Sequence, residues 1–228
     1  WLCDDTRPVK DVHWWGSYKG WLERNPPPGQ NPAYWQIAFW TNAPIDAVHP
    51  YSRPQKLLWS IRVKPERVEE VWVGMDHFPD PDVIPDSCFQ YFVKLQPEEV
   101  FWQEKYIASQ GGDTVFWISI TAVYRGFPGP IYPWGWKTRP AHWMDDGVTF
   151  SLRQDDLQSG QVLDPATITP IKASICGIEP QSFDLAFELD TDPNYIKWEQ
   201  PFTGLRHWPH YEDEMSMGQE HTVTTELT

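Results

Sequence analysis

Residues 11–21 read DVHWWGSYKGW, and this stretch places three indoles and a tyrosine within eleven positions. Read as a strand, in which successive side chains point to opposite faces, Trp14 and Trp15 lie on different sides. One indole can fill a core between two sheets, but its neighbour must then be covered by something else. We therefore expect one of the two to pack between sheets and the other to seal a loop or a neighbouring molecule.

Short runs in which apolar and polar residues alternate continue along the chain, and this period is typical of strands. Such runs occur at 33–41, 56–63, 67–75, 87–95, 114–124 and 182–189. The run TVFWISITAVY at 114–124 is apolar on both sides, which predicts a strand in the middle of a sheet.

The run SFDLAFEL at 182–189 has the cleanest alternation. It predicts an inward face and a wet outer face, the latter carrying Asp184 and Glu188. The residues expected to face inward are Phe183, Leu185, Phe187 and Leu189.

Proline and glycine separate these runs, with 23 Pro and 14 Gly in 228 residues. Such punctuation favours turns over long helices. Only QPEEVFWQEKY at 96–106 is typical of a helix, with Pro97 at its first turn and Glu98 and Glu99 at the positive end of its dipole. The sequence therefore predicts an all-β fold: a two-sheet antiparallel sandwich, jelly-roll-like, with long Pro/Gly-rich loops and at most one short helix.

Charge and composition limit the partners of the chain. Its net charge of −14 would repel nucleic acid and anionic lipid surfaces. No apolar run approaches the ~18 residues that span a bilayer, so we expect no membrane span. The chain starts at Trp1 without a signal-like segment, from which we expect a processed chain or a fragment.

The three cysteines lie far apart and show no metal-binding or redox spacing. One long-range disulfide with one buried thiol is our first interpretation, with Cys3 and Cys176 as the pair. Three reduced core thiols are the alternative.

The character of the chain changes near residue 190, which predicts a sandwich domain at 1–190 and an extended tail or linker at 191–228. Alternation returns only in HTVTTELT at 221–228, where Val223, Thr225 and Leu227 share a face. This terminal segment is expected to be a strand that pairs either in its own sheet or on the open edge of a neighbouring copy.

Four motifs carry a resemblance to a known family: HWWGS at 13–17, YPWGWKTRP at 132–140, DLAFEL at 184–189 and KWEQP at 197–201. Together they resemble a domain of unknown function from secreted bacterial multidomain proteins that carry cell-surface sorting signals. The resemblance spans Trp1 to about Pro201. It implies an extracellular or cell-surface β-module and no particular chemistry.

The KWEQP segment departs from the family pattern, in which a KWxQP segment precedes HWWGS. Here it lies at the other end of the chain. A piece cut from a tandem array, in which the tail begins the next copy, would have this arrangement. Alternatively, a second short motif closes each domain.

Aromatic surface is the main functional signal, because 15 Trp are several times the usual share. Flat indoles on an exposed loop stack against sugar rings, and nearby polar side chains bond the hydroxyls. The candidate residues for a glycan or a partner are Trp14, Trp15, Trp21, Trp134, Trp136, Lys137, Arg139, His142 and Trp143. The alternative is that these indoles fill the gap between the sheets.

Clustered carboxylates are candidate ligands for structural calcium, which takes six to eight oxygens. The candidates are Asp80, Asp82, Asp86, Asp145 and Asp146. None has the EF-hand spacing, and solvated acidic turns are the alternative. We expect no other cofactor.

Catalytic signatures are weak. The sequence lacks G-x-S-x-G, phosphate-loop and HExxH motifs, so we expect no catalytic residue and a non-enzymatic role. A glycoside-active enzyme remains an alternative, in which Asp145 or Asp146 would pair with Glu188.

Two functions remain. In the first, the chain is a structural module that self-associates into a surface assembly or filament through aromatic edges and an exchanged C-terminal strand. The residues expected at that contact are Trp198, Trp208, Val223, Thr225 and Leu227. In the second, it is a carbohydrate-binding module with exposed indoles. The first also explains the tail, so it is the leading hypothesis.

Overall fold

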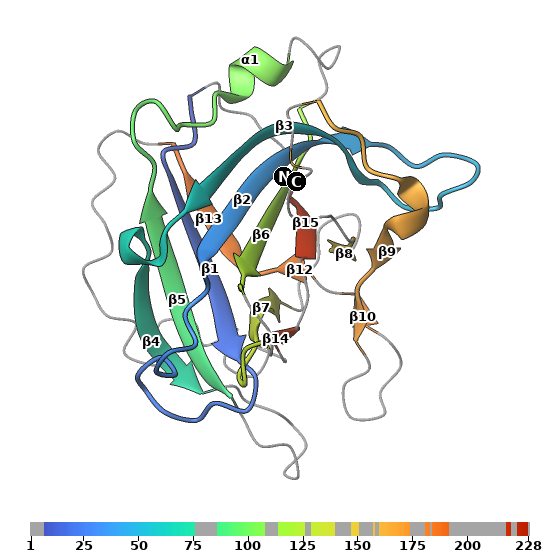
Figure 1. The fold of residues 1–228 in the computed structure, drawn as a ribbon. Helices are drawn as coiled ribbons and strands as arrows, with labels where there is room; N and C mark the ends of the chain where they lie inside the picture. The colour runs from blue at the N-terminus through green and yellow to red at the C-terminus, as the bar shows by residue number, and fades with distance from the viewer. Residues whose placement is uncertain are drawn as a thin grey trace.

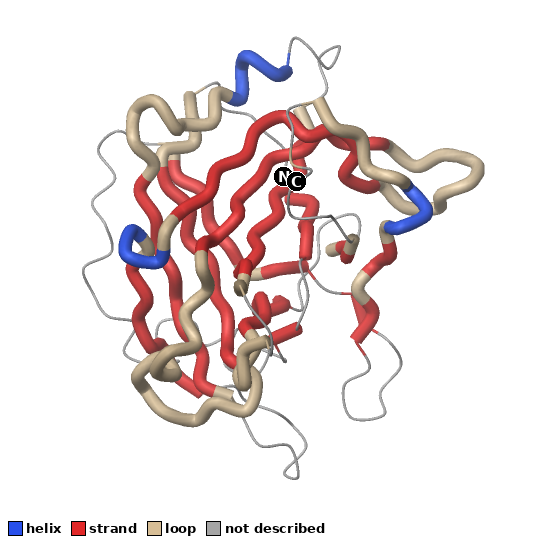
Figure 2. Tube along the Cα trace, in the orientation of Figure 1, coloured by secondary structure: helices blue, strands red, loops and turns tan. Residues whose placement is uncertain are grey.

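Two antiparallel sheets pack face to face in a sandwich (Figures 1 and 2). The computed structural model describes residues 7–75, 86–107, 114–125, 129–139, 147–150, 157, 160–173, 181–182, 184–191, 218–219 and 223–227. The predicted all-β sandwich is therefore confirmed. Its helical parts are one α-helix, α1 (Gln103–Ile107), and 3-10 turns at Pro65–Arg67 and Pro165–Thr167, as far as the chain is described.

The first sheet has the strand order β12-β7-β1-β5-β4, with β13 also paired to β1 and β14 to β7. Its strands are β1 (Asp11–Tyr18), β4 (Glu69–Met75), β5 (Ser87–Lys94), β7 (Trp134–Arg139), β12 (Asp184–Leu185), β13 (Phe187–Asp190) and β14 (Gly218–Gln219). The DVHWWGSY segment thus forms the central strand β1.

The second sheet has the order β3-β2-β6-β15-β8-β9. Its strands are β2 (Tyr34–Ala43), β3 (Arg53–Val63), β6 (Phe116–Val123), β8 (Val148–Thr149), β9 (Thr169–Pro170) and β15 (Val223–Leu227). A separate hairpin is formed by β10 (Lys172–Ala173) and β11 (Gln181–Ser182). Strand β6 lies between β2 and β15, which confirms its predicted place inside a sheet.

The main core lies between the two sheets and is built largely from aromatic rings. Trp14 of β1 is fully buried, stacks on Tyr91 at 5.4 Å and meets Trp35 edge to face. Trp15 points to the opposite face and is buried with Val73 and Cys88. The prediction that one of the paired indoles packs between the sheets is confirmed for Trp14.

A second core covers the outer face of the second sheet. Trp40 and Trp117 are fully buried there, next to Phe150 and Leu163. Each indole N–H finds a partner, because Trp40 donates to the Ser119 hydroxyl at 3.0 Å and Trp117 donates to the Asn42 side-chain oxygen at 2.9 Å. Both faces of this sheet are thus apolar, which accounts for much of the tryptophan content.

Strand β1 shares one of its edges between two partners. Residues 11–14 pair with β13 and residues 16–18 with β7. Ala186 lies at the switch, since its N–H donates to Lys137 O at 2.8 Å and its carbonyl accepts from Trp15 N–H at 3.2 Å. On its other edge β1 pairs with β5 over residues 11–17.

Two local predictions need correction. The helix expected at 96–106 is shorter, because residues 97–99 form a turn and Phe101 forms a β-bridge with Val9, so α1 begins only at Gln103. Asp184 was expected to face solvent but is only 3% exposed, because the chain crosses from β7 to β1 directly after it. Leu185 and Phe187 are buried as predicted.

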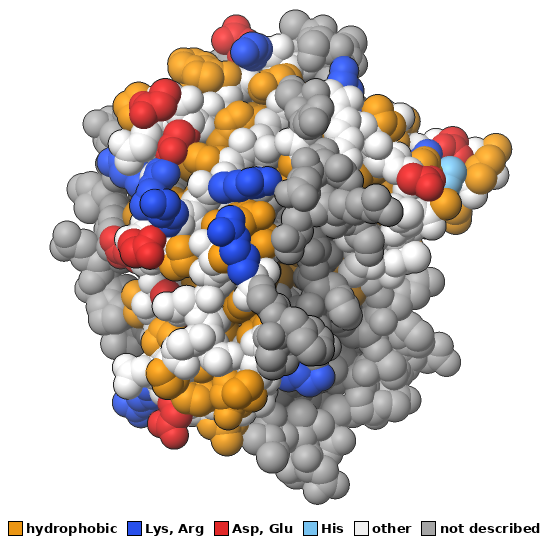
Figure 3. Space-filling view, in the orientation of Figure 1, with side chains coloured by type: hydrophobic (Ala, Val, Ile, Leu, Met, Phe, Trp, Pro, Cys, Tyr) orange, Lys and Arg blue, Asp and Glu red, His pale blue; other side chains and the backbone are white. Residues whose placement is uncertain are grey.

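No helix within the described part of the chain is long and apolar enough to cross a membrane. On the face in Figure 3, hydrophobic side chains lie between Lys and Arg side chains. Several arginines cover aromatic rings: Arg24 lies over Trp72 at 4.7 Å, and Arg62 lies over Tyr34 at 5.1 Å.

Candidate functional site

The chain that enters β1 is held by backbone hydrogen bonds on both sides. Val9 exchanges two bonds with Phe101, with N···O distances of 2.9 and 3.2 Å. Lys10 donates its N–H to Asp190 O at 2.8 Å, and its carbonyl accepts from Leu95 N–H at 2.7 Å. Three segments that are distant in sequence therefore meet at residues 9–10, and a pocket opens where they meet.

The turn at residues 96–99 forms one wall of this pocket. The Arg67 guanidinium donates to both carboxylate oxygens of Glu99, at 2.8 and 2.6 Å. Glu99 also accepts from the Gln96 N–H at 2.9 Å, which closes the turn. The Arg67 bonds hold the pKa of the Glu99 carboxyl below its usual range. The charged, bidentate pair therefore stays intact at neutral pH.

Trp102 lines the pocket and follows a buried neighbour that fixes its position. Phe101 is fully buried and stacks on Phe39 at 4.2 Å and on Tyr106 at 5.2 Å. Trp102 directly follows it and is 51% exposed. The Gln103 amide donates to Arg7 O at 2.9 Å, which ties the start of α1 to the N-terminal segment. Among the described tryptophans, Trp102 is the one whose side chain is largely exposed.

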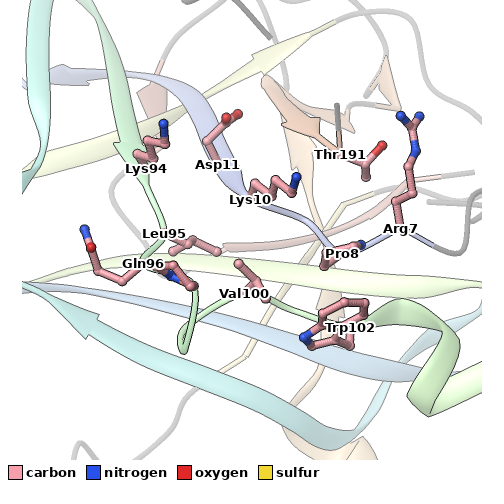
Figure 4. Close-up of a pocket in the computed structure, with 11 residues that line it drawn as sticks. Arg7, Pro8, Lys10, Asp11, Lys94, Leu95, Gln96, Val100, Trp102 and Thr191 are labelled. Carbon is pink, nitrogen blue, oxygen red and sulfur yellow. The ribbon is translucent and has the colours of Figure 1, made fainter. Parts of the chain in front are cut away.

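The pocket is a cavity of about 610 Å³ with two chemically different sides (Figure 4). Its apolar side includes Pro8, Leu95, Val100 and Trp102. Its charged side carries Asp11 and the three pocket cations, which are Arg7, Lys10 and Lys94. A volume of this size suits a small organic ligand or a few sugar residues.

Asp11 is the buried polar group of the pocket. Its side chain lies at the start of β1 and the residue is only 5% exposed. No hydrogen-bond donor pairs with its Oδ1 atom within the described chain, and His13 Nε2 lies 3.4 Å away. A buried carboxylate oxygen without a donor is costly. The imidazole of His13 lies against this oxygen, and Asp11 adds one negative charge to the wall of the pocket.

The arrangement can bind a sugar without reacting with it. An exposed indole offers a flat apolar surface for the C–H face of a pyranose ring. Carboxylate and ammonium groups beside it accept from and donate to hydroxyl groups.

A second polar cluster lies between the sheets, around Glu70 of β4. The Tyr91 hydroxyl donates to Glu70 Oε1 at 2.8 Å. Burial raises the pKa of Glu70 and also raises that of Tyr124, the latter to about 12. The pKa of Tyr18 is raised for the same reason, and its hydroxyl lies near Glu70 without a hydrogen-bond geometry. Burial therefore makes the ionised form of the Glu70 carboxyl more costly inside the sandwich.

The first group of predicted ligand-binding indoles belongs mainly to the interior. Trp14 and Trp15 are 0% and 6% exposed, so the expectation of an exposed sugar-stacking surface at these two residues is corrected. Trp21 is half-buried, packs edge to face on Tyr132 at 5.0 Å and donates to Asn25 O at 2.7 Å. Trp21 therefore fastens a loop.

The second predicted group lies on a strand, whereas a loop was expected. Trp134, Trp136 and Lys137 of β7 are at most 5% exposed, so they present no open face to a ligand. Trp136 Nε1 donates to Ala186 O at 2.9 Å, which ties β7 to the switch between β12 and β13. Arg139 ends β7, paired in register with Asp184. His142 and Trp143 lie outside the described residues.

Of the predicted calcium ligands, only Asp86 is described. Its carboxylate accepts from Gly20 N–H at 2.8 Å, and partial burial raises its pKa. It therefore has a local structural partner. Within the described ranges, no three His, Cys, Asp or Glu side chains gather as a metal site would require. Asp80, Asp82, Asp145 and Asp146 lie outside those ranges.

The predicted assembly residues of the tail lie on β15 where they are described. Val223, Thr225 and Leu227 are in register with Ile120, Ile118 and Phe116 of β6. Trp198 and Trp208 fall outside the described chain, as do Cys3 and Cys176 of the predicted disulfide. Glu188, the described member of the paired carboxylates, is exposed on β13.

Sequence reasoning missed Trp102. One signal was available: FW at 101–102 repeats the paired-aromatic pattern of WW at 14–15, in which one ring must face away from the core. Because the segment was expected to be helical, its two rings were not assigned to opposite sides. The cations of the pocket come from segments that no local pattern connects.

The fold and the pocket define an all-β sandwich module with one aromatic residue displayed beside a cavity. Within this class, the chain belongs to the family of a domain of unknown function, DUF7901, whose model matches residues 1–190. The expected resemblance to an uncharacterised domain is thereby confirmed. Searches of curated proteins and of solved structures found no significant match.

Proposed function

We propose that this chain is a non-catalytic extracellular module that binds carbohydrate at the Trp102 pocket. The observation that carries the proposal is the position of Trp102, half exposed in the wall of a cavity of about 610 Å³. The other described indoles are buried or half-buried, so this ring has a different role from theirs. A sugar ring covering it would remove apolar surface from water on both partners.

The frame around Trp102 supports a binding role. The pocket walls are fixed by the Val9–Phe101 bridge and by the Arg67–Glu99 pair. A site that is formed before the ligand arrives loses little conformational entropy on binding.

The test is calorimetric titration of the protein with a broad panel of oligosaccharides. We expect at least one glycan to bind, and Trp102→Ala to weaken that binding by about tenfold, because the loss of one stacked ring costs on the order of 1 kcal/mol. Ile131→Ala is the matched control, since Ile131 is 76% exposed and does not line the pocket. A panel without binding, or equal affinity in Trp102→Ala, would refute the proposal.

Self-association is the second candidate, and it would use exchange of the terminal strand β15. This last strand lies inside the second sheet, between β6 and β8, while residues 191–222 separate it from β13. Its removal would leave the β6 edge open, and the β15 of a neighbouring copy could fill the same place. In the single chain, β15 completes its own sheet, so exchange needs a second copy to displace it.

Strand exchange is tested by the size of the particles in solution. We expect the full chain to form dimers or larger assemblies as its concentration rises, and a chain ending at residue 196 to stay monomeric. Light scattering on both proteins gives the answer, with circular dichroism to confirm that the shorter chain is folded. Full-length material that is monomeric at all concentrations would rule out exchange.

A further inference from the structure

We propose that the Trp102 pocket recognises an acidic sugar, a uronic acid whose carboxylate lies among the three pocket cations. This inference rests on the proposed function and deepens it by naming the charge of the ligand. A uronic acid carries on one ring the two groups that the pocket complements, an apolar pyranose face and a carboxylate.

The charge of the pocket is opposite to that of the chain. The whole protein carries 18 Lys and Arg against 32 Asp and Glu, a net charge of −14. Among the described residues, the pocket collects the cations Arg7, Lys10 and Lys94, and Asp11 is the one carboxylate that lines it. A cluster of cations is not what the average composition of a strongly acidic chain would place around a pocket.

Screening decides which of these charges a ligand experiences. At physiological salt the Debye length is about 8 Å, so exposed charges farther away contribute little. A carboxylate inside the pocket therefore experiences mainly the charges that line it, which are the three pocket cations and Asp11. A long polyanion with a charge at each step would also meet the acidic surroundings. The site thus suits a chain end or a short acidic stretch.

Two kinds of group in the pocket match a uronic acid. The Trp102 indole accepts the apolar face of the ring, and the cationic side chains attract a carboxylate and donate charge-assisted hydrogen bonds to it. In Figure 4 the charged side and the Trp102 side face the same cavity.

The experiment compares two ligands that differ only in charge: tetragalacturonate with free carboxylates and its fully methyl-esterified form. Calorimetry at about 20 and about 300 mM NaCl is expected to show the free acid binding at least about tenfold more tightly at low salt. That advantage should shrink at high salt. Arg7→Gln and Lys94→Gln should each weaken binding of the acid severalfold and leave binding of the ester unchanged.

Control variants keep the two levels of the proposal separate. Lys56→Gln removes an exposed cation that does not line the pocket and should change nothing. Trp102→Ala should weaken acid and ester alike. Equal affinity for acid and ester, or for a sulfated glycan in place of the acid, overturns the uronic-acid inference while carbohydrate binding stands. No binding of either ligand overturns the inference, and the wider glycan panel then decides the proposed function.

Discussion

Gly16 explains why a glycine follows the paired indoles in HWWGS. A Cβ atom at this position would overlap the indole of Trp134, which packs across β1 from β7. The ring can therefore lie flat on the strand only if residue 16 has no side chain. Trp134 in turn contacts Trp35 edge to face at 4.9 Å, so the close approach at Gly16 supports the intersheet aromatic cluster.

Gly16→Ala should therefore destabilise the fold by roughly 1–3 kcal/mol, the usual cost of overpacking a core. Urea unfolding followed by circular dichroism measures it. Gly129→Ala is the matched control, because an added Cβ there meets no atom within 4 Å and its backbone needs no glycine. Equal stability of the two variants would show that Trp134 has room to move.

For single residues, the sequence predicted only in part which indole packs in the core. Period-2 alternation separates Trp14 from Trp15, but it cannot say which side meets the second sheet. Nor can it distinguish Trp102 from the buried tryptophans, because exposure depends on whether another segment covers the ring. The coverage of each indole is a property of the folded chain.

Strand β4 is the outermost strand on one side of the first sheet, and it carries Glu70 toward the interior. Burial is the main cause of the raised pKa of this carboxyl, and the bond from Tyr91 opposes it. The folded state therefore binds the Glu70 proton more tightly than the unfolded chain. This contribution to stability is complete at pH values below the unfolded pKa near 4.3, and it is lost as pH rises through the higher folded pKa.

Glu70→Gln should remove this pH dependence, since an amide keeps the shape but does not titrate. We expect the variant to melt a few degrees above the parent at pH 7, with the difference shrinking toward pH 4. Melting curves from pH 4 to 8 measure it. The exposed neighbour Glu69 provides the control variant Glu69→Gln. Parallel pH profiles for parent and Glu70→Gln would contradict the assignment.

The strands and the helix were the part of this structure that the sequence predicted best. Alternation placed β2, β5 and β6 correctly, because each has strongly apolar faces that must be covered. The segment at 96–106 was predicted less well, because a Pro-Glu-Glu start is equally suited to a helix and to a tight turn. The Arg67–Glu99 pair, which joins residues far apart in sequence, decides for the turn.

The molecule as a whole carries a large excess of negative charge, and this excess opposes compaction. Local ion pairs such as Arg67–Glu99 stabilise the folded chain, but partly exposed pairs contribute only about 0–1 kcal/mol each. With a net charge of −14, the repulsion is the larger effect. Salt should therefore stabilise the fold.

Raising NaCl from about 10 to about 150 mM should increase the melting temperature by a few degrees, because the Debye length falls to about 8 Å. Differential scanning calorimetry measures the change. An uncharged osmolyte at equal osmolality is the control and should have a smaller effect. A melting temperature that falls with salt would mean that attractive pairs dominate over the net charge.

The shared edge of β1 has a consequence for the order in which the fold forms. Its partners lie at residues 87–94, 134–139 and 187–190, so the first strand of the chain waits for segments made much later. Loop closure over such spans makes folding slow. During synthesis, one edge of β1 stays without partners until residues 134–139 and 187–190 have emerged, which leaves its tryptophans available to chaperones.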